Sequence, residues 1–327
     1  MPRSKAYQKD LSKGWKSLHR RWKYTLDRKL QYSNRLLARV LKKHDRPIIC
    51  WSGGKDSTVV LHLALQHIPD IPVIYVNSGV EFKESLEFID HLVQAWNLDI
   101  TVSKPQKGQT IWDVGANYGW PILGKGVASN VERAVRTGNI RPQLSPQEVT
   151  LARHKVRISA RCSEFIQERP SKLAEESLGA DLKIVGLRAS ESRARVRLWV
   201  DHGDYYSVKR YYGRGRGIWK VNPIATWTDD DIWRYHQLNG IPHSKLYDMG
   251  YPRNGCWLCA MGIRMGQLKR LRLYHPRLFK RLITKTAMGY ELLKVKKVLT
   301  GAKNSEVMYL NDPATVLKNY PHFFDIL

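Results

Sequence analysis

The stretch PIICWSGGKDST, residues 47–58, decides the fold of this chain. Its first five residues form a short apolar run, and a helical pattern over residues 56–67 begins directly after the two glycines. A buried strand that turns sharply into a helix is the setting of an anion-binding loop, because the free amides at the helix start point at the anion. Gly53 and Gly54 would let the backbone approach a phosphate, and Lys55 would add positive charge. Hydroxyl groups come from Ser52, Ser57 and Thr58.

Strands and helices continue to alternate after this loop. Apolar runs predict strands at 71–76, 98–103 and 182–187, and helical patterns cover 81–96 and 162–178. This alternation indicates βαβ units and a parallel sheet that is covered on both faces. We therefore predict an α/β fold of the Rossmann-like type, with right-handed crossovers.

Three other segments carry different signals. Glycines punctuate residues 104–155, which we expect to be irregular. Residues 205–219, YYSVKRYYGRGRGIW, predict a hairpin or an exposed loop. Residues 228–240 predict a helix, because Thr228 is a suitable N-cap, acidic residues follow it, and a glycine ends the pattern.

The charge of the chain is strongly unbalanced. Its 327 residues hold 55 Lys or Arg against 29 Asp or Glu, which gives a formal net charge of +26. Residues 1–46 alone contain 15 Lys or Arg and 3 Asp, interleaved with aromatic residues over one or two amphipathic helices. Such a surplus favours polyanions, with nucleic acid first and an anionic membrane surface second. The alternative for residues 1–46 is a solvated helix face packed on the main domain.

Two classes of protein are disfavoured by the composition. No apolar stretch is long enough to span a membrane, and the N-terminus lacks the apolar segment of a secretory signal, so we expect a cytoplasmic protein. Four cysteines in a chain of this length are too few for a disulfide framework. Metal binding is the better hypothesis for them.

The loop SGGKDS resembles the PP-loop of the ATP pyrophosphatases, the adenine nucleotide α-hydrolase superfamily with its Rossmann-like (HUP-type) fold. Four further segments resemble the branch that contains the phosphoadenylyl-sulfate (PAPS) reductases: YVNSGVEFKESLEFI at 75–89, GLRASESRAR at 186–195, NPIATWTDDDIWRYH at 222–236 and LYDMGYPRNGCWLCAMG at 246–262. The resemblance runs in order over residues 47–262. It implies an ATP pyrophosphatase domain over that range, between a basic helical N-terminal extension, residues 1–46, and a basic helical C-terminal region, residues 263–327.

The resemblance also assigns roles around the nucleotide. ATP would be bound by Ser52, Gly53, Gly54, Ser57 and Thr58, and by Asn77, Ser78 and Gly79 after the second strand. Lys55, Arg188 and Arg193 would stabilise charge on the phosphates, while Asp56 or Ser57 would place Mg²⁺. The alternative is a simple turn at residues 77–79 and surface ion pairs around the arginines.

Three cysteines are expected to hold a [4Fe-4S] cluster. Cys256 and Cys259 form a C-x-x-C pair, which alone is compatible with zinc, redox chemistry or no role. The segment around Cys162, ARCSEFIQERP, resembles a cluster-binding segment of DNA-phosphorothioation enzymes in this branch. Only three ligands are visible, so one iron would stay open and could hold sulfide. Cys50 lies in a strand and is read as a small buried hydrophobe.

The resemblance favours an ATP-dependent sulfurtransferase that adenylates a nucleic-acid oxygen, releases pyrophosphate and replaces the adenylate with sulfur. DNA phosphorothioation is preferred over tRNA thiolation. A PAPS or adenylyl-sulfate reductase is disfavoured because no cysteine follows Cys259, and a non-catalytic nucleotide- or nucleic-acid-binding subunit is disfavoured by the intact loop. A cysteine desulfurase is the expected sulfur donor, no membrane partner is expected, and homo-oligomerisation stays open.

Overall fold

The computed structural model describes residues 5–208, 217–259, 265–300 and 310–325, with side chains from residue 13 onward. The chain forms two compact units, and neither is continuous in sequence. Unit 1 comprises residues 1–75, 84–103 and 171–245, and unit 2 comprises residues 76–83, 104–170 and 246–327. These units cut across the sequential division at residues 46 and 262, because the N-terminal extension belongs to unit 1 and the C-terminal region to unit 2.

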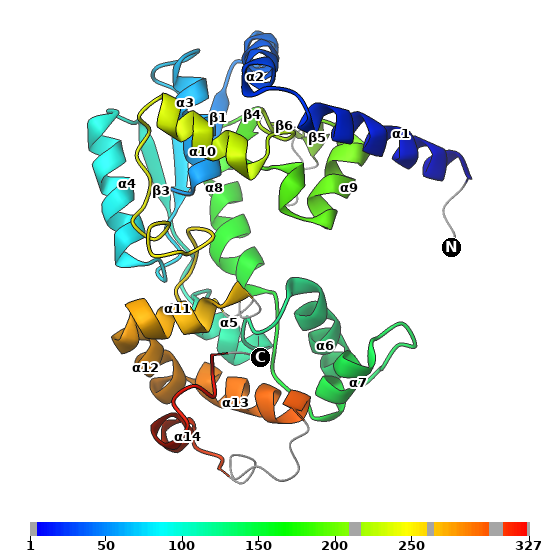
Figure 1. The fold of residues 1–327 in the computed structure, drawn as a ribbon, viewed down its shortest axis with the longest axis vertical. Coiled ribbons are helices and arrows are strands. Elements are labelled where there is room, and N and C mark those ends of the chain that lie inside the picture. Colours follow the sequence, from blue (N-terminus) through cyan, green and yellow to red (C-terminus); the bar gives the residue numbers. More distant parts are fainter. Residues whose placement is uncertain (1–4, 209–216, 260–264, 301–309, 326–327) are drawn as a thin grey trace. The chain divides into compact units, whose positions relative to one another are not determined.

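A six-stranded sheet, in the order β3-β2-β1-β4-β6-β5, forms the centre of unit 1 (Figure 1). Its strands are β1 (Pro47–Cys50), β2 (Val73–Val76), β3 (Ile100–Ser103), β4 (Leu182–Val185), β5 (Tyr205–Val208) and β6 (Ile218–Val221). β1 pairs in parallel with β2 and β4, and β4 pairs in parallel with β6. The predicted Rossmann-like α/β fold is therefore confirmed.

The edge strand β5 runs antiparallel to β6, with Tyr206 opposite Lys220. This pairing confirms the hairpin for its two strands, β5 and β6. Residues 209–216, which lie between them in the sequence, are outside the described residues.

Helices bury one face of this sheet. The core joins Ile49, Ile184 and Val221 of the strands with apolar side chains of four helices: α2 (Leu26–Leu41), α3 (Lys55–Leu65), α4 (Lys83–Ala95) and α10 (Asp229–Leu238). α10 begins with the predicted N-cap, since Thr228 and Asp231 form a reciprocal capping box.

The opposite face carries polar and apolar residues, since successive strand residues alternate between faces: Lys183 and Cys50 lie there with buried Ile48 and Ile74. Lys183 of β4 forms an ion pair of 3.0 Å with Glu175 of α8 (Arg169–Ser177). Burial raises the pKa of Cys50 to about 11, and the neighbouring Glu175 acts in the same direction. Cys50 is therefore a neutral thiol of the sheet, as the sequence indicated.

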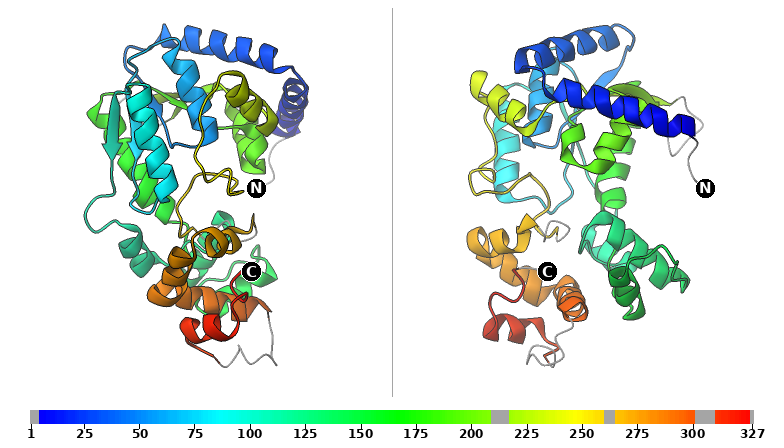
Figure 2. Two further views of the ribbon diagram at one scale, coloured as in Figure 1. Left: turned by 60° about the vertical axis from the view of Figure 1, so that its left-hand side comes forward. Right: turned by 45° about the vertical axis from the view of Figure 1, so that its right-hand side comes forward.

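The basic N-terminal segment forms two helices, α1 (Lys5–Trp22) and α2, which are separate in Figure 2. Thr25 caps α2 by accepting a hydrogen bond from the amide of Arg28 at 3.4 Å. α1 packs against α9 (Arg193–His202) through a small cluster that contains Leu18, Val196 and Trp199. The segment is thus part of unit 1.

Unit 2 is helical, which corrects the expectation that residues 104–155 are irregular. They form α5 (Ile111–Tyr118), α6 (Lys125–Thr137) and α7 (Pro146–Arg153). Capping boxes at Thr110 and Ser145 start α5 and α7. Gly119, Gly124 and Gly138 mark helix ends, so they delimit the helices of this segment.

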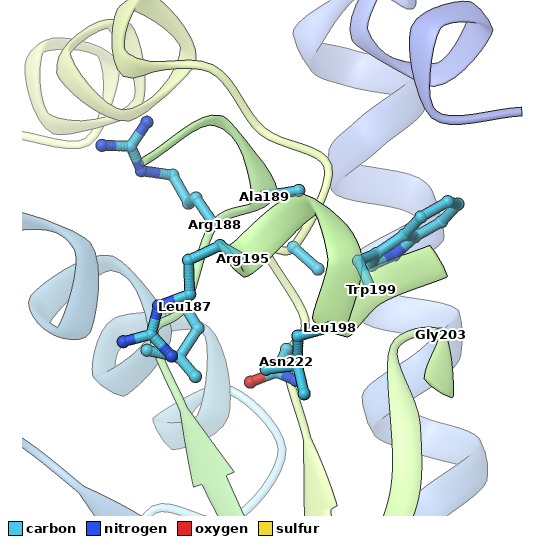
Figure 3. A pocket seen from close by; sticks show the side chains of 9 residues that line it. Leu187, Arg188, Ala189, Arg195, Leu198, Trp199, Gly203 and Asn222 are labelled. Carbon is cyan, nitrogen blue, oxygen red and sulfur yellow. The ribbon is translucent and has the colours of Figure 1, made fainter. Parts of the chain in front are cut away.

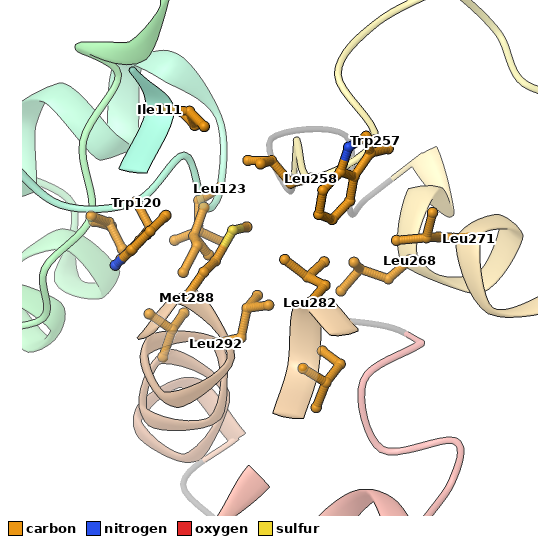
Figure 4. Close-up of a cluster of buried hydrophobic side chains, with 14 of the residues drawn as sticks. Ile111, Trp120, Leu123, Trp257, Leu258, Leu268, Leu271, Leu282, Met288 and Leu292 are labelled. Carbon is orange, nitrogen blue, oxygen red and sulfur yellow. The ribbon is translucent and has the colours of Figure 1, made fainter. Parts of the chain in front are cut away.

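The C-terminal region completes the core of unit 2. It forms α11 (Gln267–Tyr274), α12 (Pro276–Lys285), α13 (Ala287–Thr300) and α14 (Pro313–Asn319). Leu282 and Met288 are fully buried in one cluster with Trp120 and Trp257 (Figure 4). No described helix has the length and apolarity that a membrane crossing requires.

Candidate nucleotide and thiol sites

The predicted phosphate loop links β1 to α3 in unit 1. Gly53 has a φ of +69°, a left-handed conformation that favours glycine. The hydroxyl of Ser57 donates to the carbonyl of Gly54 at 2.9 Å and accepts from the amide of Ser52 at 3.3 Å. Thr58 also donates to the Gly54 carbonyl, and accepts from the indole of Trp51 at 3.1 Å. These bonds hold the loop in a defined shape at the start of α3.

The start of α3 has a glycine as its N-cap. Gly54 supplies no side-chain hydrogen bond to the first amides of the helix, and such amides are the groups that bind anions at helix starts. The chain after β4 approaches this helix closely, because a Cβ on Gly186 would lie 2.8 Å from the Cα of Ser57. A glycine at position 186 is therefore required for β4 and the phosphate loop to lie together.

Two buried cations and two carboxylates form an ionic network beside the loop. Asp229 accepts hydrogen bonds on one oxygen, Oδ1, from Lys55 Nζ at 2.6 Å and from Arg188 Nη2 at 2.7 Å. Arg188 Nε donates to Asp56, whose second oxygen lies 3.4 Å from Lys55 Nζ. Both cations are about 6% exposed, whereas the side chain of Asp229 is 56% exposed. The network thus places a solvent-accessible carboxylate oxygen between two nearly inaccessible cations.

The network lowers the pKa of Asp229. Burial opposes its ionisation, but the hydrogen bonds and charges of Lys55 and Arg188 outweigh this and hold the pKa below its usual range. Lys55 and Arg188 need such a partner because two buried positive charges that bind the same oxygen would otherwise repel each other. An anionic ligand could take the same position.

Further contacts fix these two cations. Arg188 also donates to the hydroxyl of Ser190 at 3.0 Å, and its amide donates to Glu191 at 3.1 Å. His236, which is buried, lies 3.0 Å from the carbonyl of Lys55 and 3.1 Å from that of Ile241. Burial lowers the pKa of His236, so a neutral ring supports the backbone of the loop.

The structure brings together Lys55, Asp56, Ser57 and Arg188 of the predicted catalytic set, but places Arg193 differently. Arg193 is the first residue of α9 and is exposed. Among the described residues it has no hydrogen bond to the network. The sequence analysis missed Asp229, which it read as one of several acidic residues at a helix start.

A pocket adjoins Arg188 in unit 1 (Figure 3). Arg188, Arg195 and Asn222 are its polar lining, and Leu198 and Trp199 are among its apolar residues. Asn222 is 4% exposed, and its Oδ1 atom has no hydrogen-bond partner among the described residues. The pocket therefore has a mixed polar and apolar lining and shares Arg188 with the ionic network.

The remaining predicted nucleotide residues belong to unit 2. Asn77 Oδ1 accepts a hydrogen bond from the amide of Gly79 at 3.0 Å, and Gly79 has a φ of +80°. The amide and hydroxyl of Ser78 donate to Glu81 at 2.8 and 2.5 Å. The segment is therefore a tight turn with its polar groups satisfied within unit 2.

Unit 2 also gathers the three cysteines of the predicted cluster. Cys256 Sγ lies 3.7 Å from the hydroxyl of Ser78, and Cys256 pairs with Glu81 in an isolated β-bridge. Burial and then the charge of Cys259 raise the pKa of Cys162 to about 11 and that of Cys256 to about 12. Cys259 is thus close enough to Cys162 and Cys256 to oppose their ionisation.

Cysteine thiolates are the ligands that iron–sulfur clusters use, so these residues have the donor chemistry that the predicted cluster requires. Iron would take them as thiolates and remove their mutual repulsion. Among the described residues, no three His, Cys, Asp or Glu side chains converge closely enough to bind a single metal ion. A [4Fe-4S] cluster has a different requirement, because each thiolate binds a different iron. Cys50 belongs to unit 1 and lies outside this group.

Comparison with known proteins gives matches to PAPS reductases and to proteins of unassigned function. An uncharacterized protein of Methanocaldococcus jannaschii is 26% identical over 244 residues, which are 73% of this chain and 41% of that protein. The chain thus spans less than half the length of that relative. A phosphoadenosine 5'-phosphosulfate reductase of Xylella fastidiosa is 29% identical over 222 residues, 68% of this chain and 76% of that protein.

Among solved structures, a PAPS reductase from Candida auris aligns with a TM-score of 0.45 and 15% identity, over 71% of this chain and 94% of that chain. An FMN adenylyltransferase from Candida glabrata aligns with a TM-score of 0.44 and 12% identity, over 76% of this chain and 72% of that chain. The family model of the phosphoadenosine phosphosulfate reductase domain matches residues 46–122 and 125–261. The chain therefore belongs to the phosphoadenosine phosphosulfate reductase domain family.

Proposed function

We propose that this chain is an ATP pyrophosphatase that activates an oxygen of DNA for replacement by sulfur. The observation that carries the proposal is the ionic network of Lys55, Arg188, Asp56 and Asp229 beside the start of α3, where the N-cap is a glycine. Two cations that share a single carboxylate oxygen are suited to exchange it for phosphate oxygens.

The proposed reaction begins when a phosphate oxygen of DNA attacks the α-phosphorus of ATP. A new P–O bond forms, the bond between the α-phosphorus and the bridging oxygen breaks, and pyrophosphate leaves. Lys55, Arg188 and the first amides of α3 would stabilise the charge that develops on the phosphates. The carboxylates of Asp56 and Asp229, released from these cations, are suitable ligands for Mg²⁺. Sulfide sulfur then attacks the activated phosphorus of DNA, and AMP leaves.

Cys162, Cys256 and Cys259 would hold a [4Fe-4S] cluster, and sulfide for the second step would form when a thiol reductant reduces the persulfide of a cysteine desulfurase. When bound, the cluster would hold that sulfur at its open iron. The support is that Cys162 and Cys256 are thiols whose pKa values are raised by burial and by the neighbouring Cys259 in unit 2. Iron and sulfide quantitation after anaerobic purification tests this assignment. We expect Cys162→Ala to lose the cluster and Cys50→Ala to retain it. Zinc, or a full cluster in Cys162→Ala, would contradict the assignment.

The activity itself is tested by measuring pyrophosphate released from ATP, with sodium sulfide as the sulfur source, in the presence of duplex DNA or tRNA. DNA is then digested and analysed by mass spectrometry for phosphorothioate. We expect DNA-stimulated pyrophosphate release that falls at least about 100-fold in Lys55→Gln, because a group that stabilises transition-state charge is lost. Lys42→Gln, which removes an exposed charge of unit 1, should retain full activity. Stimulation by tRNA alone would favour tRNA thiolation.

The family match and the Xylella fastidiosa relative favour a second candidate, the reduction of PAPS or adenylyl sulfate. Sulfite production from either compound with thioredoxin would support this candidate. Nucleotide binding without any turnover would favour a binding subunit. We prefer sulfur transfer because the four cysteines of the sequence are Cys50, which is a sheet residue, and the three proposed cluster ligands.

A further inference from the structure

Helix α1 presents a row of exposed basic side chains on its outer face. Lys13, Lys16 and Arg20 are exposed and recur at helical spacing. No Asp or Glu lies among residues 13–22. Trp15, which is 40% exposed, stacks on His19 with 5.6 Å between ring centroids. The outer face of α1 is therefore a continuous basic surface with an aromatic edge.

The inner face of α1 is anchored, so the basic row has a fixed position in unit 1. Asp204, which is 8% exposed, accepts hydrogen bonds from Arg21 of α1 at 3.1 Å, Tyr32 of α2 at 2.5 Å and Trp199 of α9 at 2.6 Å. The helices also approach closely, since a Cβ on Gly14 would lie 2.5 Å from a methyl group of Val200. These contacts explain Arg21 as a structural residue but give no such role to the three outer cations.

Helix α9, the partner of α1, also exposes basic side chains, with one exposed carboxylate, Asp201, in its last turn. Arg193 and Arg197 are exposed, whereas Val196 and Trp199 face the α1 cluster. α9 begins five residues after Arg188, whose guanidinium binds Asp56 and Asp229. A short chain segment therefore connects α9, which packs against α1, to Arg188 of the proposed phosphate site.

We propose that Lys13, Lys16, Arg20, Arg193 and Arg197, together called the α1–α9 surface, bind the phosphate backbone of duplex DNA. The inference rests on the proposed function, because it assigns the docking surface for that substrate. The row from Lys13 to Arg20 spans about 10 Å of helix. A duplex carries one charge per roughly 1.7 Å of its axis, so this length of duplex holds about six phosphates, and a single strand holds about half as many.

An anionic membrane fits this surface less well. A helix that lies on a membrane inserts its apolar face into the lipid. The apolar residues Leu18 and Trp22 of α1 instead pack in the cluster with α9. Trp15 is the one large exposed hydrophobic residue among the described side chains of α1. Charge without an exposed apolar face favours a hydrophilic polyanion.

The test compares two triple variants that each remove three exposed charges from one helix of unit 1. The first is Lys13→Gln, Lys16→Gln, Arg20→Gln on α1. The matched control is Arg35→Gln, Arg39→Gln, Lys43→Gln, at and just beyond α2, where the side chains are also exposed and helically spaced. Fluorescence anisotropy with labelled duplex DNA, single-stranded DNA and an RNA hairpin gives Kd over a series of salt concentrations. ATP binding by calorimetry is measured on the same samples.

We expect the α1 variant to bind duplex DNA at least about tenfold more weakly than the parent and to flatten the slope of log Kd against log salt by about 0.9 per lost contact. The α2 variant should bind DNA nearly as the parent does, and both should bind ATP unchanged. Equal losses in the two variants would overturn the proposal, because attraction would then follow net charge alone. Tighter binding of single strands or RNA by the parent would overturn the assignment to duplex DNA.

Two further measurements distinguish a loss of DNA contacts from a loss of folding, and the proposed surface from the proposed function. If the α1 variant unfolds at a lower temperature than the parent, Arg197→Gln on α9 replaces it, with an expected slope change of about 0.9 for one contact. An unchanged slope there would contradict the proposal. A parent protein that binds duplex DNA through another surface would leave the proposed function intact, whereas a parent that binds no DNA at any salt concentration would refute both.

Discussion

The two units differ in the charge state of their buried reactive groups. In unit 1, Lys55 and Arg188 are buried as charged groups, and each is paired with the carboxylates of Asp56 and Asp229. In unit 2, Cys162 and Cys256 are kept neutral, because burial and neighbouring thiols raise their pKa values. In unit 1 the charges are paired without any ligand, whereas in unit 2 the thiols of Cys162 and Cys256 carry no charge.

This difference indicates which kind of ligand each unit can accept. An anion can enter unit 1 by replacing a carboxylate, so little charge has to be desolvated. A thiol cluster gains most from a metal centre, which converts it to thiolates. The two sites therefore need separate tests. One removes a charged side chain of the ionic network, and the other removes a buried apolar side chain from the core around the thiols.

The largest expected effect concerns the packing around the thiols. Leu282 of α12 is fully buried, and Leu282→Ala should lower the free energy of unfolding by about 2–5 kcal/mol, because a cavity replaces the side chain. We also expect faster alkylation of the unit 2 thiols at pH 8 while ATP binding is unchanged. Leu273→Ala is the matched control, because Leu273 is 63% exposed. Equal stabilities of the two variants would show that α12 does not carry this core.

A smaller effect is expected from removing one cation of unit 1. Arg188→Met should cost about 1–3 kcal/mol, because two carboxylates lose hydrogen bonds from a charged group that is 5% exposed. ATP binding should weaken as well, while thiol alkylation in unit 2 stays at the parental rate. Thermal unfolding and calorimetry measure these changes, with exposed Arg197→Met as the control for stability. A stable variant that binds ATP normally would contradict the role of the network.

The smallest effect concerns the exposed carboxylate of the network. Asp229→Asn should reduce stability by less than about 1 kcal/mol at pH 7, because the side chain is more than half exposed. The folded-state pKa of Asp229 lies below its unfolded value, so its contribution is present above the usual aspartate pKa of about 3.9 and is lost as the pH falls through the lower folded value.

Thermal unfolding of the parent and of Asp229→Asn from pH 7 down to pH 2 checks this sign. The difference in melting temperature should close in the acid range, and Asp230→Asn, the exposed neighbour, should show no comparable difference. A gap that widens on acidification would mean that Asp229 is not held ionised by the two cations.

Much of unit 1 could be predicted from the sequence, because its strands are short apolar runs bounded by turn residues. The strand at residues 47–50 and the helix from residue 55 lie within two residues of their predicted bounds. The helices of residues 104–155 were missed because glycines were taken as breakers throughout the segment. The capping boxes at Thr110 and Ser145 were signals that could have identified two of those helices.

The ionic network could be predicted only in part. Lys55 and Arg188 follow from motifs, but Asp229 binds Lys55 from 174 residues away in the chain. Locally, an aspartate at position 229 is explained by the start of α10, where acidic side chains are favourable. Only the folded sheet, which brings three segments together, reveals that one of the three aspartates at this helix start pairs with the cations.

The packing of α11–α14 also bears on which segments of the gene can be exchanged between relatives. The family similarity stops at residue 261, yet Leu268, Leu282 and Met288 beyond it share one core with Trp120 and Trp257. A gene fragment that stops at the family boundary would encode the residues that match the family but not α11–α14. The apolar side chains that pack against these helices would then be exposed to solvent. Recombination between relatives should therefore tolerate exchange of the whole segment from residue 246 onward better than exchange at the edge of the recognisable similarity.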